Sequence, residues 1–209
     1  GVNGAGKTTT IKMLSCLIKP TSGDAEVLGH SINKEPFAVK QQINVSPQET
    51  AVAPNLSVRE NLEFIAGIYG NDRKTSIEKA NKMIASFGLA GIEKDKAKTL
   101  SGGWQRRLSI AMALISEPKM LFLDEPTLGL DVIARRELWQ VIEGLKGKIT
   151  IILTTHYLEE AVALSDRIGI MARGELKAAG TADELMKQAG MDNFEDAFIK
   201  IAGEGGSGV

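Results

Sequence analysis

The chain has 209 residues, of which 43% are hydrophobic and 24% are charged, and its formal net charge is -1 at pH 7. A chain this close to neutral has no general attraction to nucleic acid, so no nucleic-acid partner is expected. A single cysteine, Cys16, excludes an internal disulfide and suits a reducing compartment. No apolar run approaches the ~18 residues of a membrane-spanning helix, so any work at a membrane is expected to need a partner.

The first eight residues, GVNGAGKT, have the spacing G-x-x-x-x-G-K-[ST], with Gly1, Gly6, Lys7 and Thr8 at the fixed positions. Glycines lack a Cβ, so successive backbone N–H groups can turn inward around an anion. A helix is expected to follow, and a helix N-terminus carries partial positive charge. The spacing predicts a phosphate-binding loop, in which Lys7 reaches the β- and γ-phosphates and Thr8 offers its hydroxyl to Mg²⁺. The alternative is a glycine-rich turn that happens to precede a helix.

Strands and helices alternate along the chain. The expected helices are TTTIKMLSCLI (8–18), SVRENLEFIAGIYG (57–70), TSIEKANKMIASFG (75–88), GGWQRRLSIAMALISEP (102–118), VIARRELWQVIEGLKG (132–147), YLEEAVALSD (157–166), TADELMKQAG (181–190) and NFEDAFIKIAG (193–203). The expected strands are EVLG (26–29), QINVSPQ (42–48), KMLFLDEP (119–126), ITIILTTH (149–156) and two within RIGIMARGELKAAG (167–180). Pro20 and Gly23 are expected to stop the first helix, and Pro118 the fourth.

Two of these strands, KMLFLDEP and ITIILTTH, are nearly unbroken apolar runs, as expected when both faces of a strand are covered. Helices that alternate with buried strands predict an α/β fold with a largely parallel sheet. Residues 51–100 hold expected helices only, which predicts a separate helical lobe. Two of its helices start with a capping-box spacing, Ser57 with Glu60 and Thr75 with Glu78.

Two adjacent carboxylates, Asp124 and Glu125, end the first buried strand. Ligands of open α/β sheets bind at the carboxyl ends of the strands. Adjacent carboxylates repel each other and lose hydration there unless a cation compensates them, and Mg²⁺ is that cation if Thr8 and a phosphate share the site. Asp124 would then support the metal, and Glu125, pointing the other way, could accept a proton from an attacking water. The alternative is a strand-to-loop turn with two solvated acids.

Two further polar segments stand beside expected elements. His156 ends the second buried strand, where it could hydrogen-bond a γ-phosphate or the attacking water, although a lone histidine is more often structural. In LSGGWQRR (100–107), Ser101, Gly102 and Gly103 expose backbone amides just before a helix, which predicts a second anion site. The alternative there is an ordinary serine N-cap. One nucleotide cannot obviously use both anion sites, but two copies of the chain facing head to tail could.

Together these segments resemble the motifs of the ATP-binding cassette (ABC) ATPases, in that family's order and over nearly the whole chain. GVNGAGKT resembles the Walker A loop, Gln48 in VSPQET the Q-loop glutamine, and LSGGWQ (100–105) the signature. MLFLDEP resembles Walker B with its catalytic glutamate, LGLD (128–131) the D-loop, and His156 the switch histidine.

The resemblance implies a P-loop NTPase-type fold and a single ABC ATPase domain over residues 1–209. Its expected parts are a RecA-like core at 1–50 and 118–180, a helical lobe that carries the signature at 51–117, C-terminal helices at 181–202 and a flexible tail at 203–209.

In this family two cassettes sandwich two ATP molecules, each between one subunit's Walker A loop and the other's signature. The resemblance therefore implies ATP and Mg²⁺ as cofactors. The implied catalytic residues are Glu125 as base, His156, Lys7 and Gln48. The implied metal site is formed by Thr8, Gln48 and Asp124. The implied nucleotide-contacting residues are Asn3, Gly4, Ala5, Gly6, Lys7, Thr8, Thr9, Ser101, Gly102, Gly103 and Asp131, the last of which contacts the opposite subunit.

Two departures from the family pattern matter. Trp104 stands where the signature usually has glutamine, and Gln105 follows it. Ser101 and Gly103 remain, so function is expected to survive. The family also has strands before the Walker A loop, one of which supplies an aromatic residue that stacks on adenine. The chain is interpreted as a fragment of a longer cassette in which these strands are missing.

The resemblance also implies partners. We expect a transmembrane permease subunit and a second cassette, identical or not, which would place the chain peripherally at the cytoplasmic face of the membrane. NFEDAFIKIAGE and TTHYLEEA resemble the subfamily that serves exporters, whose permease selects the substrate. The alternatives are a soluble ABC ATPase with a non-membrane partner, and a cassette that binds ATP without hydrolysing it. Glu125 and His156 argue against the second.

Overall fold

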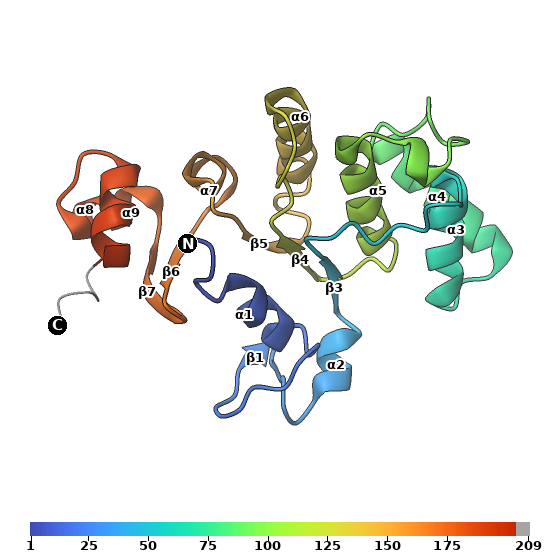
Figure 1. The fold of residues 1–209 in the computed structure, drawn as a ribbon. Helices are drawn as coiled ribbons and strands as arrows, with labels where there is room; N and C mark the ends of the chain where they lie inside the picture. Colours follow the sequence, from blue (N-terminus) through green and yellow to red (C-terminus); the bar gives the residue numbers. More distant parts are fainter. Residues whose placement is uncertain (204–209) are drawn as a thin grey trace. The chain divides into compact units, whose positions relative to one another are not determined.

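The computed structural model of the chain describes residues 1–203 (Figure 1), so the expected flexible tail lies outside the described residues except for Gly203. The chain forms two compact units. Unit 1 combines Gly1–Met13 with Thr154–Val209, and unit 2 consists of Leu14–Leu153. The expected division into a core, a helical lobe and C-terminal helices stays a prediction.

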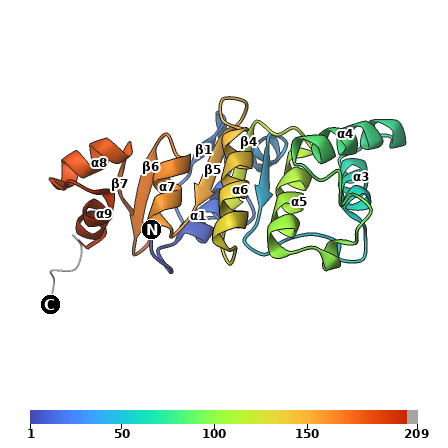
Figure 2. The same cartoon turned by 90° about the horizontal axis from the view of Figure 1, so that it is seen from above.

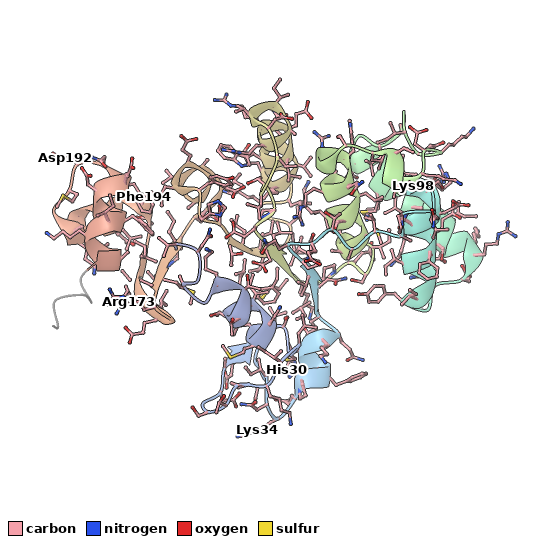
Figure 3. The ribbon with its side chains drawn as sticks, in the orientation of Figure 1. His30, Lys34, Lys98, Arg173, Asp192 and Phe194 are labelled. Atoms are coloured by element: carbon pink, nitrogen blue, oxygen red, sulfur yellow. The ribbon has the colours of Figure 1, made fainter. Side chains whose placement is uncertain are left out.

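Unit 1 contains an antiparallel hairpin of β6 (Ile168–Ala172) and β7 (Glu175–Gly180), which confirms the two strands expected around Arg173 and Gly174. Both turn residues have positive φ, 53° and 78°, and Figure 3 marks Arg173 at the turn. α8 (Ala182–Ala189) and α9 (Phe194–Gly203) pack on the hairpin. Together they bury an apolar cluster of Ile168, Ile170, Ala178, Leu185, Ala189, Ala197 and Ile201. α1 (Lys7–Leu14) and α7 (Leu158–Leu164) also belong here, although Leu14 itself falls in unit 2.

Unit 2 is built on a three-stranded sheet with the order β3–β4–β5. Its strands are β3 (Ile43–Ser46), β4 (Met120–Asp124) and β5 (Thr150–Thr154), although Thr154 itself falls in unit 1. β3 and β4 run parallel, with Val45 opposite Phe122. Leu121, Phe122 and Leu123 are fully buried, as expected for a strand that is covered on both faces. The parallel pairing and the alternating helices confirm the expected α/β fold.

The helices α3 (Val58–Ile68), α4 (Arg73–Ser86) and α5 (Gly102–Leu114) lie together on one side of this sheet (Figure 2). The capping box expected for α3 is present: Ser57 Oγ accepts from the Glu60 N–H at 3.1 Å, and the Glu60 carboxylate accepts from the Ser57 N–H at 2.7 Å. The remaining long helix of unit 2 is α6 (Val132–Glu143).

Some expected boundaries are wrong. α4 begins at Arg73 rather than at Thr75, because Asp72 Oδ1 accepts from the Thr75 N–H at 2.7 Å and caps the helix. α1 ends at Leu14, before Pro20, because Cys16 has a φ of 57°, which a right-handed helix does not contain. α5 ends at Leu114, and Glu117 has a φ of 52°.

The strand expected at 26–29 is present as the shorter β1 (Glu26–Val27). Three short elements are not predicted from the sequence: β2 (His30–Ser31), α2 (Pro36–Lys40) and the 3-10 turn η1 (Ala97–Thr99). Within residues 1–203, no helix has both the length and the apolar character that crossing a membrane would require.

Candidate functional site

The expected phosphate loop has the backbone that its glycines predict. Gly4 and Gly6 have φ values of 77° and 96°, in the left-handed region that favours glycine. Among residues 1–203, apart from Gly4 and its two neighbours in the chain, no heavy atom lies within 4 Å of the position that a Cβ on Gly4 would take. The loop closes through a hydrogen bond from the Ala5 N–H to the Val2 carbonyl at 3.2 Å. It then enters α1, where the Thr10 N–H donates to the Gly6 carbonyl at 2.9 Å.

Lys7 folds back over this loop. Its Nζ donates to the Gly1 carbonyl at 2.7 Å and to the Val2 carbonyl at 3.2 Å. The ammonium group and the positive end of the α1 dipole therefore lie at the same turn of chain. This combination suits a ligand with several negative oxygens.

The rest of unit 1 supports the loop from two sides. The Gly174 N–H, in the β6–β7 turn, donates to the Ala5 carbonyl at 3.1 Å. A Cβ on Gly1 would lie 2.4 Å from the Met171 carbonyl oxygen, so the loop touches β6 at a distance that only glycine allows. The Gly1 nitrogen also donates to the Thr155 carbonyl at 3.4 Å, one residue before His156.

His156 follows β5 in a short turn that precedes α7. The Tyr157 N–H donates to Thr155 Oγ1 at 3.0 Å, and the His156 and Tyr157 rings lie 4.2 Å apart, centroid to centroid, at an angle of 38°. The structure thus brings the segment of His156 and the start of the phosphate loop together in unit 1.

The other expected site residues belong to unit 2. Asp124 ends β4 and Glu125 follows it, and both are buried, at 4% and 6% exposure. Glu125 has a φ of 48°, so the main chain turns sharply as it leaves the strand. This burial disfavours the alternative of two solvated acids in a surface turn.

Gln48 lies just beyond β3, and both Gln48 and Glu49 are exposed. Its neighbour is a residue that the sequence analysis missed. Arg106, on α5 and 4% exposed, donates through Nη1 to the Pro47 carbonyl at 2.5 Å and through Nη2 to the Gln48 carbonyl. Burial lowers the pKa of the Arg106 guanidinium, and the carboxylate of Asp124 opposes that shift. Arg106 therefore hydrogen-bonds to the main chain at Gln48 and interacts electrostatically with Asp124 at the end of β4.

The signal for Arg106 was present in the spacing. Arg106 stands four residues before Ile110 and seven before Ala113, so all three share one helical face. Ile110 and Ala113 are buried. A charge on that face needs a polar partner, and the two carbonyls provide it.

The signature segment starts α5. Ser101 occupies the N-cap position, but its side chain makes no capping hydrogen bond, which disfavours the alternative of an ordinary serine cap. Ser101 and Gly102 are exposed. A Cβ on Gly103 would lie 3.1 Å from the Cβ of Ala134, so this glycine allows α5 to approach α6 closely.

Trp104, which departs from the family pattern, lies against Arg107, and Arg107 joins α5 to α6. The Arg107 guanidinium carbon lies 4.7 Å from the centroid of the Trp104 ring. Arg107 Nη2 also donates to Glu137 Oε2 at 2.7 Å, which ties α5 to α6. Asp131 caps α6, because its Oδ1 accepts from the N–H groups of Ile133 and Ala134, each at 2.9 Å. The start of the signature and the D-loop segment are thus joined through two packed helices.

The expected metal donors are a threonine hydroxyl, a glutamine amide and one carboxylate, Asp124. Among residues 1–203 there is no group of three or more His, Cys, Asp or Glu side chains placed to hold a metal ion. Hard oxygen donors that supply only part of a coordination shell suit Mg²⁺, which keeps several waters and takes phosphate oxygens as ligands.

Comparison with known proteins gives a family match. The family model described as ABC transporter matches residues 1–128. The chain is also similar to the daunorubicin resistance ATP-binding protein DrrA3 of Streptomyces coeruleorubidus, with 41% identity over 210 residues. That alignment covers 100% of this chain and 66% of DrrA3, so the chain spans just under two thirds of this relative.

Two solved structures have similar folds. The ATP-binding subunit of an ABC transporter has a TM-score of 0.81 at 28% identity, over 96% of this chain and 85% of that chain. The ATP-binding cassette MJ0796, in a dimeric post-hydrolysis state with ADP and Pi, has a TM-score of 0.76 at 26% identity, over 87% of this chain and 82% of that chain.

Proposed function

This chain belongs to the ABC transporter family, and on that premise we propose that it binds and hydrolyses ATP as the ATP-binding subunit of a transporter. The observation that carries the proposal is the geometry of the phosphate loop. Gly4 and Gly6 adopt left-handed backbone, α1 begins at Lys7, and the Lys7 ammonium rests on the carbonyls of the loop. These features are the glycine backbone, the helix N-terminus and the cation from which a phosphate-binding loop is built.

In this proposal the phosphates bind to the loop and to the first turn of α1. Replacing Gly4 or Gly6 by any residue with a side chain would strain the main chain of the loop, because both glycines have positive φ. Lys7 would exchange its contacts with the Gly1 and Val2 carbonyls for phosphate oxygens. The proposed phosphate-contacting residues are Asn3, Gly4, Ala5, Gly6, Lys7, Thr8 and Thr9.

Hydrolysis needs a base, a metal site and a group at the γ-phosphate. We propose Glu125 as the base that takes a proton from the attacking water, with His156 at the γ-phosphate. Thr8, Gln48 and Asp124 would hold Mg²⁺, which when bound neutralises charge on the phosphates. The low exposure of the Asp124 and Glu125 side chains supports these roles, because water competes less with charges in a buried site.

The second anion site requires a partner cassette. Ser101, Gly102 and Gly103 start α5, and we propose that they contact the γ-phosphate held by the opposite cassette, with Asp131 near the same interface. Support comes from the serine side chain that makes no cap bond, and from MJ0796, whose structure is a dimer. The structure of a post-hydrolysis state with ADP and Pi in that relative supports hydrolysis as the reaction.

We propose further that the chain works with a transmembrane permease subunit at the cytoplasmic face of the membrane, and that transport is export. The name of DrrA3, a resistance protein, supports export. The alternatives are an ABC ATPase that acts on a non-membrane partner and a cassette that binds ATP without hydrolysis. The buried Glu125 at the end of β4 speaks against the second.

Calorimetric titration of Mg-ATP into the chain and into its Lys7→Met variant tests the binding step. Loss of one hydrogen bond from a charged group costs ~1.5–3 kcal/mol, so the affinity of the variant should fall roughly 10- to 100-fold. Lys12→Met is the matched control, because Lys12 is an exposed lysine on the same helix. Equal affinity for the Lys7→Met variant and the unchanged chain would contradict the proposal.

A further inference from the structure

Arg106 is a charged side chain in the apolar interior of unit 2. It lies on α5 with 4% of its surface exposed, and Ile110, one turn further along the same face of the helix, is fully buried. A guanidinium stays charged in proteins, so its burial is tolerated only where acceptors surround its donors. The acceptors here are main-chain carbonyls of a single short segment.

The two contacts of Arg106 form a fork over successive residues. Nη1 donates to the Pro47 carbonyl at 2.5 Å, and Nη2 donates to the Gln48 carbonyl. A guanidinium can make two such bonds at a fixed spacing because it is planar, whereas a lysine ammonium is a point charge on a flexible stem. The fork therefore fixes the orientation of the chain at Pro47 and Gln48 as well as its position.

The segment needs this support because the sheet ends just before it. β3 stops at Ser46, and Pro47 has no N–H to continue the strand pairing. Gln48 and Glu49 are exposed, so side-chain packing does not hold them. A second contact, between Ser46 Oγ and Ser109 Oγ at 3.1 Å, joins α5 to the last residue of β3 but stops short of Gln48.

We propose that Arg106 is a positioning residue: it fixes the main chain at Pro47 and Gln48 and so orients the Gln48 side chain, an inference that rests on the role proposed above for Gln48 at Mg²⁺. Arg106 and Ser101 belong to the same helix, Arg106 one turn beyond the start of the signature. A displacement of α5 therefore reaches Gln48 directly through the guanidinium.

The first test measures the Pro47–Gln48 segment without ATP. A protease that cleaves after glutamate is applied to the native chain, and cleavage after Glu49 is compared with cleavage after Glu63 and Glu143 in helices. Arg106→Met should accelerate cleavage after Glu49 about tenfold and leave the two helical sites unchanged, because the lost fork frees the loop alone. The rate of cleavage after Glu49 in Arg106→Lys should lie between the rates of Arg106→Met and of the unchanged chain.

Ser109→Ala is the matched control, because it removes the neighbouring contact between α5 and β3 and leaves the fork in place. Its Glu49 cleavage should stay at the level of the unchanged chain. A rate after Glu49 that is unchanged in Arg106→Met, or a rise at all three glutamates alike, would overturn the proposal.

The second test measures ATP turnover as a function of Mg²⁺. Arg106→Met should need about tenfold more Mg²⁺ for half-maximal turnover and should lose kcat about tenfold, with KM for ATP little changed, because a misplaced group weakens the reacting geometry more than nucleotide binding. If Arg106→Met accelerates cleavage after Glu49 but leaves ATP turnover unchanged, the two hydrogen bonds of Arg106 do not position Gln48 for its role. This result would also overturn the proposal. If the unchanged chain shows no turnover, the proposed function fails while the cleavage test still decides whether Arg106 holds the segment.

Discussion

At the scale of single residues, Glu125 occupies the least relaxed position of the candidate site. A non-glycine residue with a φ of 48° carries strain on the order of 1–3 kcal/mol, which the surrounding structure must offset. Positive φ alone does not mark function, because other non-glycine residues share it: Cys16, Leu28, Glu117 and Arg173. What distinguishes Glu125 is a carboxylate at 6% exposure, directly after the buried Asp124 at the end of a strand.

Asp131 caps a helix within this chain, in addition to the contact with a second subunit that is expected of it. The sequence resemblance implies that it contacts the opposite subunit, and this stays a prediction. The structure gives its Oδ1 two hydrogen bonds from the first turn of α6. The cap fixes where α6 begins, and α6 in turn packs beside the start of α5 through Ala134 and Gly103.

At the scale of elements, α4 depends on a cap that the sequence analysis assigned to the wrong residue. Asp72 Oδ1 accepts from the Thr75 N–H at 2.7 Å, and this backbone hydrogen bond lowers the pKa of the Asp72 carboxyl. A charged acceptor at a helix N-terminus also complements the helix dipole. α4 should therefore lose stability when Asp72 loses its charge.

We expect Asp72→Ala to destabilise the chain at pH 7, and Thr75→Ala to have a smaller effect, as measured by chemical denaturation. The folded pKa of Asp72 lies below its unfolded value, so the carboxylate contributes its full stabilisation above the unfolded pKa of ~3.9 and loses it as the pH falls through the folded pKa. The difference between Asp72→Ala and the unchanged chain should shrink as the pH drops below ~4. A difference that stays constant down to pH ~2 would show that the cap acts without its charge.

The elements with strong local signals could be predicted from the sequence. The β4 strand follows from an unbroken apolar run, the α3 cap from Ser57 and Glu60, and the loop glycines from their spacing. Short elements such as β2 and α2 could not, because two to five residues carry too little periodicity. The early end of α1 depends on the positive φ of Cys16. It could not be predicted, because a positive φ is usually signalled by glycine and this position is a cysteine.

At the scale of the whole molecule, the support of the phosphate loop comes from residues far along the chain. Gly174 and Met171, in the hairpin of β6 and β7, contact Ala5 and Gly1 within unit 1. Local sequence patterns do not predict such contacts, because the tertiary fold of the unit determines them. The sequence could therefore indicate the type of the loop and its chemistry, but not the hairpin that holds it.

The proposed pairing of two cassettes makes a prediction about mass. In a background of Glu125→Gln, which should trap ATP between two chains, Mg-ATP should double the mass measured by light scattering. Ser101→Arg in the same background should stay monomeric, because its side chain would occupy the place of the opposite γ-phosphate, while its own ATP binding measured by calorimetry should not change. A variant with Ser101→Arg that still forms dimers would contradict the head-to-tail arrangement.

The central claim is that this chain hydrolyses ATP with Glu125 as the base, and the rate of phosphate release from Mg-ATP tests it most directly. The Glu125→Gln variant keeps the shape of the side chain and cannot take up the proton, so its rate should fall by ~10²–10⁴-fold while ATP affinity is retained. Equal rates of phosphate release from the variant and the unchanged chain would contradict the account.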